Sequence, residues 1–272
     1  MSTLRTVFSL VAEHDFELEG MDVDAAYLNA PLEEELFVKL PPECSPFSRD
    51  IPFVRRLRKS TNLLVAVYVG DLVIAGRREK VDEFKHNISQ RFRMKDLGSL
   101  SRVLGIEVRR DRPSGTITIS QGSYIREVLK TYGFDECRGV PTSAEGKVKI
   151  SAPDSRGRSG NSTEYKGMVR LLMYVSTGTR PDIAYAVHQA ARRMEDPCRQ
   201  DFSTCNRIFR YLSTVPDLGI TFGDKSIGHG LEGFVDADWA EDIEDRKSTT
   251  GYVVKLNGGA ISWCSRKQQL VT

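Results

Sequence analysis

Acidic residues at the ends of apolar segments are the residues best placed to do chemistry in this chain. Asp71 follows Gly70 between two apolar runs, Leu63–Val69 and Leu72–Ile74, and the first run predicts a strand buried on both faces. A Gly-Asp pair in this setting is typical of a tight hairpin turn, and it would hold one carboxylate rigidly beside a buried sheet. A rigid carboxylate suits a metal ligand, but an ordinary hairpin turn explains the same pattern.

A second acidic pair, Asp22 and Asp24, lies at the end of a predicted strand, Phe16–Val23. If this strand neighbours the hairpin, Asp22 and Asp71 could bind Mg²⁺ between them, because magnesium prefers a few carboxylates plus waters and substrate phosphates. A pair of such ions about 4 Å apart would activate an attacking hydroxyl and stabilise a leaving pyrophosphate. Spacing alone also allows two unrelated acids at strand ends.

A third acidic pair, Asp236 and Asp238, ends the predicted strand Leu231–Val235. A calcium-binding EF-hand loop is excluded here, because Ala240 and Glu241 occupy the positions that need an oxygen ligand and a glycine. A metal site of another kind and a solvated acidic strand end both remain open.

The composition is that of a globular protein. The chain has 272 residues, 40% of them hydrophobic and 28% charged, enough for one large domain or two ordinary ones. The five cysteines include no Cys-x-x-Cys pair, which favours free thiols in a reducing compartment. No apolar stretch is long enough to cross a bilayer and the first residues are too polar for a signal peptide. We therefore expect an intracellular protein, in the cytoplasm or nucleus, with no membrane partner.

The charge pattern is compatible with nucleic acid but does not require it, since the net charge is only +2. Four basic clusters stand out, and each is either a solvated face or part of a phosphate-binding surface. They are Arg55–Lys59, Arg77–Lys80, Arg109–Arg112 and Arg246-Lys247.

Hydrophobic periodicity predicts the elements that must position these residues, and their order indicates an α+β fold with an antiparallel sheet. The first half of the chain should contain a helix over Leu4–Val11, the strand Phe16–Val23, the hairpin, a helix over Glu79–Phe92, a second hairpin of Val103–Val108 with Thr116–Ser120, and a helix over Tyr124–Tyr132. A polar linker over Ser143–Thr163 should precede helices over Tyr165–Thr177, Pro181–Met194 and Phe202–Leu212, and then strands over Leu218–Phe222, Leu231–Val235, Gly251–Leu256 and Ala260–Cys264.

Taken in order, several segments resemble the Pol polyprotein of copia-type LTR retrotransposons over nearly the whole chain. The segments that carry the resemblance are Met21-Asp-Val-Asp-Ala-Ala-Tyr-Leu-Asn-Ala30, Tyr68-Val-Gly-Asp71, Met94-Lys-Asp-Leu-Gly98, Leu104-Gly-Ile-Glu107, Thr179-Arg-Pro-Asp-Ile-Ala184, Arg207-Ile-Phe-Arg-Tyr-Leu212, Val235-Asp-Ala-Asp-Trp-Ala240, Asp245-Arg-Lys-Ser-Thr-Thr-Gly-Tyr252 and Ile261-Ser-Trp263. Each segment is weak evidence by itself, but the ordered set is specific.

This resemblance implies a right-hand polymerase followed by ribonuclease H. The palm and thumb would occupy residues 1–142, a linker and helical connector 143–215, and an incomplete ribonuclease H-like domain 216–272. The implied activity is RNA-directed DNA polymerisation by two-metal nucleotidyl transfer. Its cofactor would be Mg²⁺, and its partners would be an RNA template, a DNA primer or RNA/DNA hybrid, and deoxynucleotides.

The same resemblance implies roles for single residues. Asp22 and Asp71 would be catalytic metal ligands of the polymerase site, and Asp236 would be the first metal ligand of ribonuclease H. Tyr27 would lie beneath the incoming sugar, where an aromatic ring excludes a 2′-hydroxyl and so selects deoxynucleotides.

Three departures from the family pattern predict a defective enzyme. Gly70 stands where the family has the first aspartate of a Tyr-Val-Asp-Asp motif. Only a short join remains near residues 47–63, where the family carries several dozen residues. The chain also ends at Thr272, before the family's later ribonuclease H acids. We therefore expect little or no polymerase activity and no ribonuclease H activity. The alternatives are a non-catalytic nucleic-acid-binding module and a decaying transposon product with no selected role.

Overall fold

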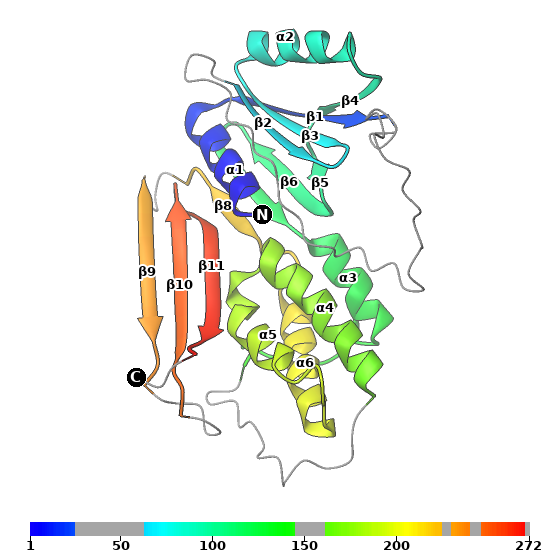
Figure 1. The fold of residues 1–272 in the computed structure, drawn as a ribbon, viewed down its shortest axis with the longest axis vertical. Helices are drawn as coiled ribbons and strands as arrows, with labels where there is room; N and C mark the ends of the chain where they lie inside the picture. Colours follow the sequence, from blue (N-terminus) through cyan, green and yellow to red (C-terminus); the bar gives the residue numbers. More distant parts are fainter. Residues whose placement is uncertain (25–62, 145–160, 225–229, 240–245, 270–272) are drawn as a thin grey trace, which may run out of the picture.

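The computed structural model of the chain describes residues 1–24, 63–144, 161–224, 230–239 and 246–269. Within these ranges it contains antiparallel sheets at one side and one end, and a bundle of helices at the other end (Figure 1). This mixture of helices and antiparallel strands confirms the predicted α+β class.

The first sheet has the strand order β2-β3-β1-β4. Its strands are β1 (Glu17–Val23), β2 (Leu63–Tyr68), β3 (Asp71–Gly76) and β4 (Met94–Ser99). The sequence predicted the first three but not β4, because Lys95, Asp96 and Gly98 interrupt any apolar alternation there. Pairing along β1, rather than an apolar face, makes that segment a strand.

Helices cover both faces of this sheet. Helix α1 (Ser2–His14) lies on one face and α2 (Arg78–Ser89) lies on the other. Leu72 and Ile74 of β3 pack with Val81 of α2, whereas Val73 and Ala75 pack in the cluster that contains α1. Burial on both faces explains why β3 reads as an unbroken apolar run.

Two sequence predictions about these elements were wrong. The run Leu63–Val69 was expected to be buried on both faces, but β2 is an edge strand, most of it is only half-buried, and Val67 and Val69 are exposed. The helix predicted over Glu79–Phe92 ends at Ser89, and Phe92 is exposed.

The second sheet joins segments far apart in the sequence, in the order β5-β6-β7-β8. Its strands are β5 (Arg102–Val103), β6 (Ile106–Asp111), β7 (Thr116–Ser120) and β8 (Ile220–Phe222). The strand predicted over Val103–Val108 is broken by Leu104 and Gly105, whose φ angles are +50° and +71°. The strand predicted over Leu218–Phe222 is shorter and pairs with β7.

The helical bundle has a core of its own. It consists of α3 (Gly122–Thr131), α4 (Ser162–Gly178), η3 (Pro181–Ile183), α5 (Ala184–Ala191) and α6 (Arg199–Thr214). The helix predicted over Pro181–Met194 begins instead as a 3₁₀ turn and ends at Ala191. Buried Arg180 fixes this turn, since its guanidinium bonds the Asp182 carboxylate and donates to the Val215 carbonyl at 2.8 Å.

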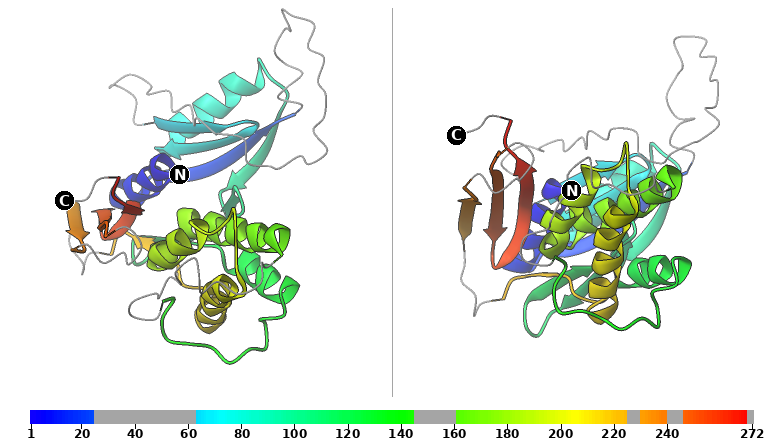
Figure 2. Two further views of the ribbon diagram at one scale, coloured as in Figure 1. Left: turned by 60° about the horizontal axis from the view of Figure 1, so that its bottom comes forward. Right: turned by 90° about the horizontal axis from the view of Figure 1, so that it is seen from below.

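The third sheet has the order β11-β10-β9 and consists of β9 (Leu231–Ala237), β10 (Thr249–Leu256) and β11 (Gly259–Lys267). It is attached through β11 and the β10–β11 turn, where Asn257 donates to Ser9 Oγ at 3.0 Å and Trp263 donates to the Ser176 carbonyl at 3.0 Å. The Arg5 guanidinium lies 3.7 Å from the Trp263 ring. In both views of Figure 2, β11 lies beside the rest of the molecule and β9 lies outermost.

Among the described residues, no helix combines the length and apolar character needed to cross a membrane.

Candidate functional site

The first sheet brings Asp22 and Asp71 together. The two residues are direct partners in the antiparallel pairing of β1 with β3. Directly opposed residues of an antiparallel pair project on the same face, with Cβ atoms about 4.5–5.5 Å apart. Both strands are in the middle of the sheet, with neighbours on each side. The condition for the predicted magnesium site, that the strand of Asp22 neighbours the hairpin of Asp71, is therefore met.

Among the residues that the structure describes, the two carboxylates have no compensating partner. Within the described ranges, neither Asp22 nor Asp71 accepts a hydrogen bond or forms an ion pair, although both are half-buried. Partial burial raises the pKa of Asp71 above its usual range, and the neighbouring negative charge of Asp22 adds to that rise. Two close, unpaired carboxylates are unfavourable by themselves and would be stabilised by a cation.

The hairpin turn differs from its sequence prediction. The Gly-Asp pair was expected to form the turn, but the turn residues are Val69 and Gly70, and Asp71 is already the first residue of β3, opposite Tyr68. Val69 adopts a φ of +52°, which is uncommon for a β-branched residue. The Gly70 carbonyl accepts a 2.9 Å hydrogen bond from the Val23 amide. Position 70 therefore lies one residue beyond the Asp22–Asp71 pair.

On the opposite face of β1, a buried carboxylate is fully paired. Glu19 has a side chain only 6% exposed and bonds Arg78 at 2.6 Å and Lys85 at 2.5 Å, both from α2. Alternation along a strand puts Glu19 and Asp22 on opposite faces. The sequence analysis did not single out Glu19, although a charge between apolar Leu18 and Met21 on a central strand was a usable signal.

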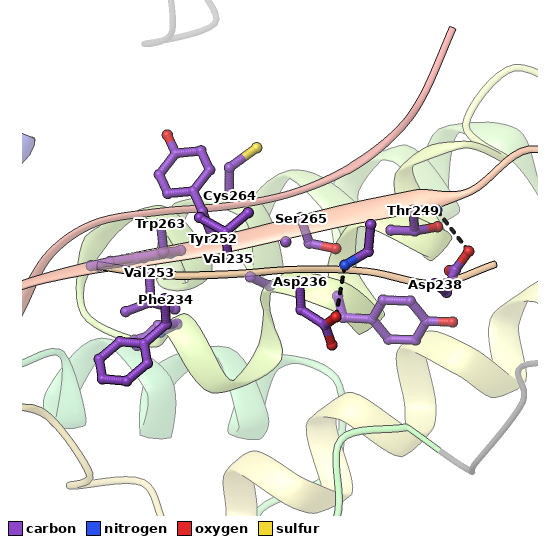
Figure 3. Close-up of a pocket in the computed structure, with 15 residues that line it drawn as sticks. Phe234, Val235, Asp236, Asp238, Thr249, Tyr252, Val253, Trp263, Cys264 and Ser265 are labelled. Carbon is purple, nitrogen blue, oxygen red and sulfur yellow. Dashed lines mark hydrogen bonds between the residues drawn. The ribbon is translucent and has the colours of Figure 1, made fainter. Parts of the chain in front are cut away.

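Asp236 is placed differently from the first two acids. It lies on β9, an edge strand in which every residue is exposed. Its Oδ1 accepts a 2.8 Å hydrogen bond from the Ala237 amide, and Asp238 Oδ1 accepts one of 3.0 Å from the Thr249 amide. Figure 3 shows both bonds, with the Asp236 and Phe234 side chains on one side of the sheet. Both acids therefore have local backbone partners.

Asp236 and Asp238 line an open pocket of about 670 Å³ between β9–β11 and the start of the helical segment at Pro181–Tyr185. Phe234, Trp263 and Tyr185 contribute aromatic surface to its walls. The described part of the chain contains no cluster of three or more His, Cys, Asp or Glu that could hold a metal ion, here or in the first sheet.

Two predicted features lie wholly or partly outside the described residues. Tyr27, expected beneath the incoming sugar, and the short join near residues 47–63 both fall in the segment 25–62, apart from Leu63 itself, which begins β2. Asp24 lies at its border and is paired with Arg93 at 3.0 Å.

Two of the basic clusters serve as partners of acidic residues. Arg78 bonds Glu17 as well as Glu19, and Lys80 bonds Glu83. In the cluster Arg109–Arg112, Arg110 pairs with Asp15, and Arg112 pairs with Asp15 and Glu17. These cations therefore hold β1, α2 and β6 together, which favours a structural role for the two clusters.

Comparison with protein families identifies the middle of the chain. A family model described as reverse transcriptase (RNA-dependent DNA polymerase) matches residues 48–145. This range contains Gly70, Asp71 and β4, whereas Asp22 lies before it.

Comparison with curated proteins extends the similarity over the full chain. The Pol polyprotein from transposon TNT 1-94 of Nicotiana tabacum is 31% identical over 317 residues, covering 100% of this chain and 24% of the relative. The Pol polyprotein from transposon RE1 of Arabidopsis thaliana is 31% identical and covers 98% of this chain and 21% of the relative. An uncharacterized mitochondrial protein of Arabidopsis thaliana is 31% identical over 77% of this chain and 85% of its own length. The chain thus spans about a quarter of the length of the Pol polyproteins.

Proposed function

Because the chain belongs to the reverse transcriptase family of copia-type retrotransposon Pol polyproteins, we propose that Asp22 and Asp71 are the carboxylates of an RNA-directed DNA polymerase site. The observation that carries this proposal is their direct opposition on central strands, with no partner for either carboxylate among the described residues. Ordinary strand-end acids find a backbone amide or a cation nearby, as Asp236 does.

The residues present fit a magnesium site. Two carboxylates on one face of a rigid sheet match the preference of Mg²⁺ for one or two carboxylates plus waters and substrate phosphates. Asp22 and Asp71 would hold the ion, whose charge would offset the burial and the repulsion from Asp22 that together raise the pKa of Asp71. When bound, Mg²⁺ would supply Lewis-acid stabilisation of the attacking oxygen and of the leaving pyrophosphate.

Gly70 weakens this site. A carboxylate at position 70 would lie next to the Asp22–Asp71 pair, because the Gly70 carbonyl already bonds the residue after Asp22. The glycine provides no ligand, so the site has two carboxylates where the family motif supplies three. Loss of one preorganised charge-stabilising group costs roughly 10²- to 10³-fold in rate. We therefore propose a polymerase site of strongly reduced activity.

A shortened central segment supports the same conclusion. The alignment with the tobacco Pol polyprotein extends over 317 residues, whereas this chain has 272. The relative therefore carries residues that this chain lacks, in keeping with the proposed deletion near residues 47–63. In this proposal residues 1–142 form the palm and thumb, residues 143–215 form the connector, and residues 216–272 form a ribonuclease H-like portion. Asp236 is the proposed metal ligand of that last portion.

Primer extension on an RNA template with Mg²⁺ tests the proposal. We expect barely detectable extension by the unmodified chain, more extension by Gly70→Asp, and none by Gly70→Asp combined with Asp22→Ala. Efficient extension by the unmodified chain that survives Asp22→Ala would overturn the assignment of the site. A silent Gly70→Asp variant that nevertheless binds Mn²⁺ would identify the central segment as the more serious defect.

Within that site, Tyr27 is proposed to select deoxynucleotides by excluding the 2′-hydroxyl. In the Gly70→Asp background, Tyr27→Val should increase incorporation of ribonucleotides relative to deoxynucleotides, whereas Tyr68→Phe should not. An unchanged ratio would contradict this role.

A further inference from the structure

The pocket between the third sheet and the helical bundle has a composition that suits a positively charged ligand. Among the described residues that line it, Asp236 and Asp238 are the only charged ones, and none is a lysine, arginine or histidine. Phe234, Tyr185 and Trp263 add aromatic surface to its walls. Negative charge beside aromatic rings attracts a cation and repels a phosphate group.

Strand pairing builds the wall of the pocket that the sheet contributes. Asp236 on β9 is the direct partner of Gly251 on β10, which is in turn the direct partner of Ser265 on β11. Directly opposed residues share a face of the sheet. Figure 3 shows the Asp236 and Phe234 side chains on one side of the sheet. The neighbouring row on that face consists of Phe234, Val253 and Trp263.

Gly251 leaves an unfilled position in the first row. A Cβ atom added to Gly251 would meet only the Cys264 carbonyl oxygen, at 3.8 Å. Asp236 lies on one side of this position and Ser265 on the other. Asp236 Oδ1 accepts a hydrogen bond from the Ala237 amide, whereas its Oδ2 has no partner within the described ranges. An open position on the sheet thus adjoins a carboxylate oxygen that can accept a hydrogen bond.

The lining favours an organic cation over a metal ion. Magnesium prefers an octahedral set of oxygen ligands and keeps several of its waters. The described part of the chain has no group of three or more His, Cys, Asp or Glu that could hold a metal ion. Aromatic rings instead attract weakly hydrated cations, and the planar guanidinium group of arginine both stacks on rings and bonds carboxylates.

The fold already uses this kind of contact at the edge of the pocket. The Arg5 guanidinium of α1 lies 3.7 Å from the centre of the Trp263 ring. Lys255 lies 5.9 Å from the centre of the Phe234 ring, but it pairs with Glu232 and does not line the pocket. The Asp236 carboxylate therefore has no cation from the described lining beside it.

The surroundings of the pocket indicate a protein partner rather than a free small molecule. Large apolar side chains on and just after β9 are exposed, namely Leu231 at 70%, Val235 at 77% and Trp239 at 83%. Exposed apolar surface around a charged pocket is typical of protein-binding sites, in which arginine is a frequent anchor. A peptide that inserts an arginine into the pocket could cover these neighbours as well.

We propose that this pocket binds the arginine side chain of a protein partner, with its guanidinium group on the Asp236 carboxylate, over Gly251 and against the aromatic walls. The inference is separate from the polymerase site of the first sheet. It uses the same carboxylate that the proposed function assigns to a metal, so the two cations would compete for Asp236.

The first test is calorimetric titration of the full chain with two blocked pentapeptides. One has a central arginine between valines, and the other has citrulline, which has nearly the same shape but no charge. We expect the arginine peptide to bind at least about 10-fold more tightly, because only its hydrogen bonds to a carboxylate are charge-assisted. Equal affinities, or no binding of the arginine peptide, would overturn the inference.

Substitutions locate the binding site. Asp236→Asn should weaken binding of the arginine peptide about 10-fold and leave the citrulline peptide nearly unaffected. Gly251→Val should abolish binding of the arginine peptide, because its side chain fills the open position. A valine suits a strand, and circular dichroism checks that the variant is folded. Unchanged affinity in folded Gly251→Val would contradict the proposed location.

Matched controls separate the pocket from general effects on the sheet. Gly233→Val places the same side chain on the opposite face of β9, where an added Cβ atom meets nothing within 4 Å. Glu127→Gln removes one exposed negative charge from α3. Both variants should bind the arginine peptide like the unmodified chain. A loss in either one equal to that of its pocket counterpart would overturn the inference.

Competition experiments distinguish this inference from the proposed function. Asp22→Asn should leave binding of the arginine peptide unchanged, so loss of the polymerase site does not affect this test. At constant ionic strength, Mg²⁺ should not displace the peptide, and displacement by Mg²⁺ would assign Asp236 to a metal instead. A single-stranded oligonucleotide that displaces the peptide from the unmodified chain, and whose own binding Gly251→Val abolishes, would assign the pocket to nucleic acid. Either of these results would overturn the inference.

Discussion

The pair Asp22 and Asp71 and the pair Asp236 and Asp238 all adjoin apolar runs in the sequence, yet the fold treats the two pairs in opposite ways. Asp22 and Asp71 lie on two central strands, opposite each other and without protein partners among the described residues. Asp236 and Asp238 lie on or just after an exposed edge strand, and each accepts a hydrogen bond from a backbone amide. Only the first pair is held rigidly while its charge remains uncompensated.

This difference shows how a functional carboxylate can be recognised in the fold. A buried charge that only stabilises the fold is paired, as Glu19 is with Arg78 and Lys85 on the other face of β1. Two like charges kept close and unpaired between buried strands reduce stability, so a ligand is the reasonable explanation for their retention. Asp236 and Asp238 meet neither condition, because each has a backbone partner and Asp236 is also exposed.

The largest expected effect is a loss of metal binding, and we expect it at Asp22 and Asp71 but not at Asp236. Asp22→Asn should weaken Mn²⁺ binding at least about 100-fold, because the ion loses one of its two protein carboxylates. Asp236→Asn should leave Mn²⁺ affinity unchanged. Electron paramagnetic resonance of free Mn²⁺ during a titration measures both. Equal losses in the two variants would show that the acids of β9 also hold the metal.

The next largest effect is on stability and compares two ion pairs, Glu19 with Lys85 in the first sheet and Glu232 with Lys255 in the third. Glu19→Ala should destabilise the chain by about 2–3 kcal/mol, because it removes a buried carboxylate and leaves partly buried Lys85 without one of its two partners. Glu232→Ala on β9 removes a half-exposed partner of Lys255, 3.6 Å away, and should cost at most about 0.5 kcal/mol. Urea unfolding followed by circular dichroism measures both. A similar cost in the two variants would contradict the assignment of Glu19 as a buried anchor of β1.

A smaller effect concerns the free energy of unfolding without metal, on which neutralising Asp71 and neutralising Asp236 should act differently. Asp71→Asn should stabilise the fold by up to about 0.5 kcal/mol, since it removes one of two repelling charges that water partly screens. Asp236→Asn should have no stabilising effect, because Asp236 is exposed and its amide replacement only weakens the hydrogen bond from the Ala237 amide. Thermal unfolding without divalent ions measures the sign. Destabilisation by Asp71→Asn would indicate that this carboxylate has a stabilising partner.

The sequence predicted the local parts of the first site because they depend on short-range patterns. Alternation around Asp22 and the unbroken apolar run after Asp71 identify two strands, and a hairpin places Asp71 at its start. The turn itself was misplaced by one residue, because Val69 adopts a positive φ against the preference of a β-branched side chain. Tertiary pairing with the end of β1 fixes that turn, which no local pattern encodes.

The other parts depend on contacts between distant segments. The register of β4 against the end of β1 follows from a β-bulge at Leu97, which Lys85 of another element stabilises through Asp96. The pairing of β8 with β7 joins residues about a hundred positions apart. Side chains such as Glu19 and Arg78 look like ordinary surface charges in the sequence and become buried or paired only after α2 packs on β1. Propensity and periodicity contain no information on such pairings.

The smallest effect concerns the attachment of the third sheet and depends on pH. His188 of α5 accepts a 3.3 Å hydrogen bond from the Lys267 amide of β11. Burial lowers the pKa of His188, and the nearby positive charges of Arg192, Arg266 and Lys267 lower it further. Protonation would remove this acceptor and add a fourth positive charge at the interface.

Because the pKa of His188 is lowered on folding, its neutral form stabilises the interface fully above the ordinary histidine pKa of about 6.5. That contribution is lost as the pH falls below this value and through the lowered pKa of the folded chain. Corrected for intrinsic rates, amide exchange in β10 and β11 should rise about two- to threefold between pH 7.5 and 5.5, while exchange in β1 and β3 should stay constant. His188→Gln, which retains an acceptor but does not titrate, should abolish the rise, and exposed His86→Gln should not. An equal rise in all four strands would mean that acid loosens the whole fold rather than the attachment of β11 to α5.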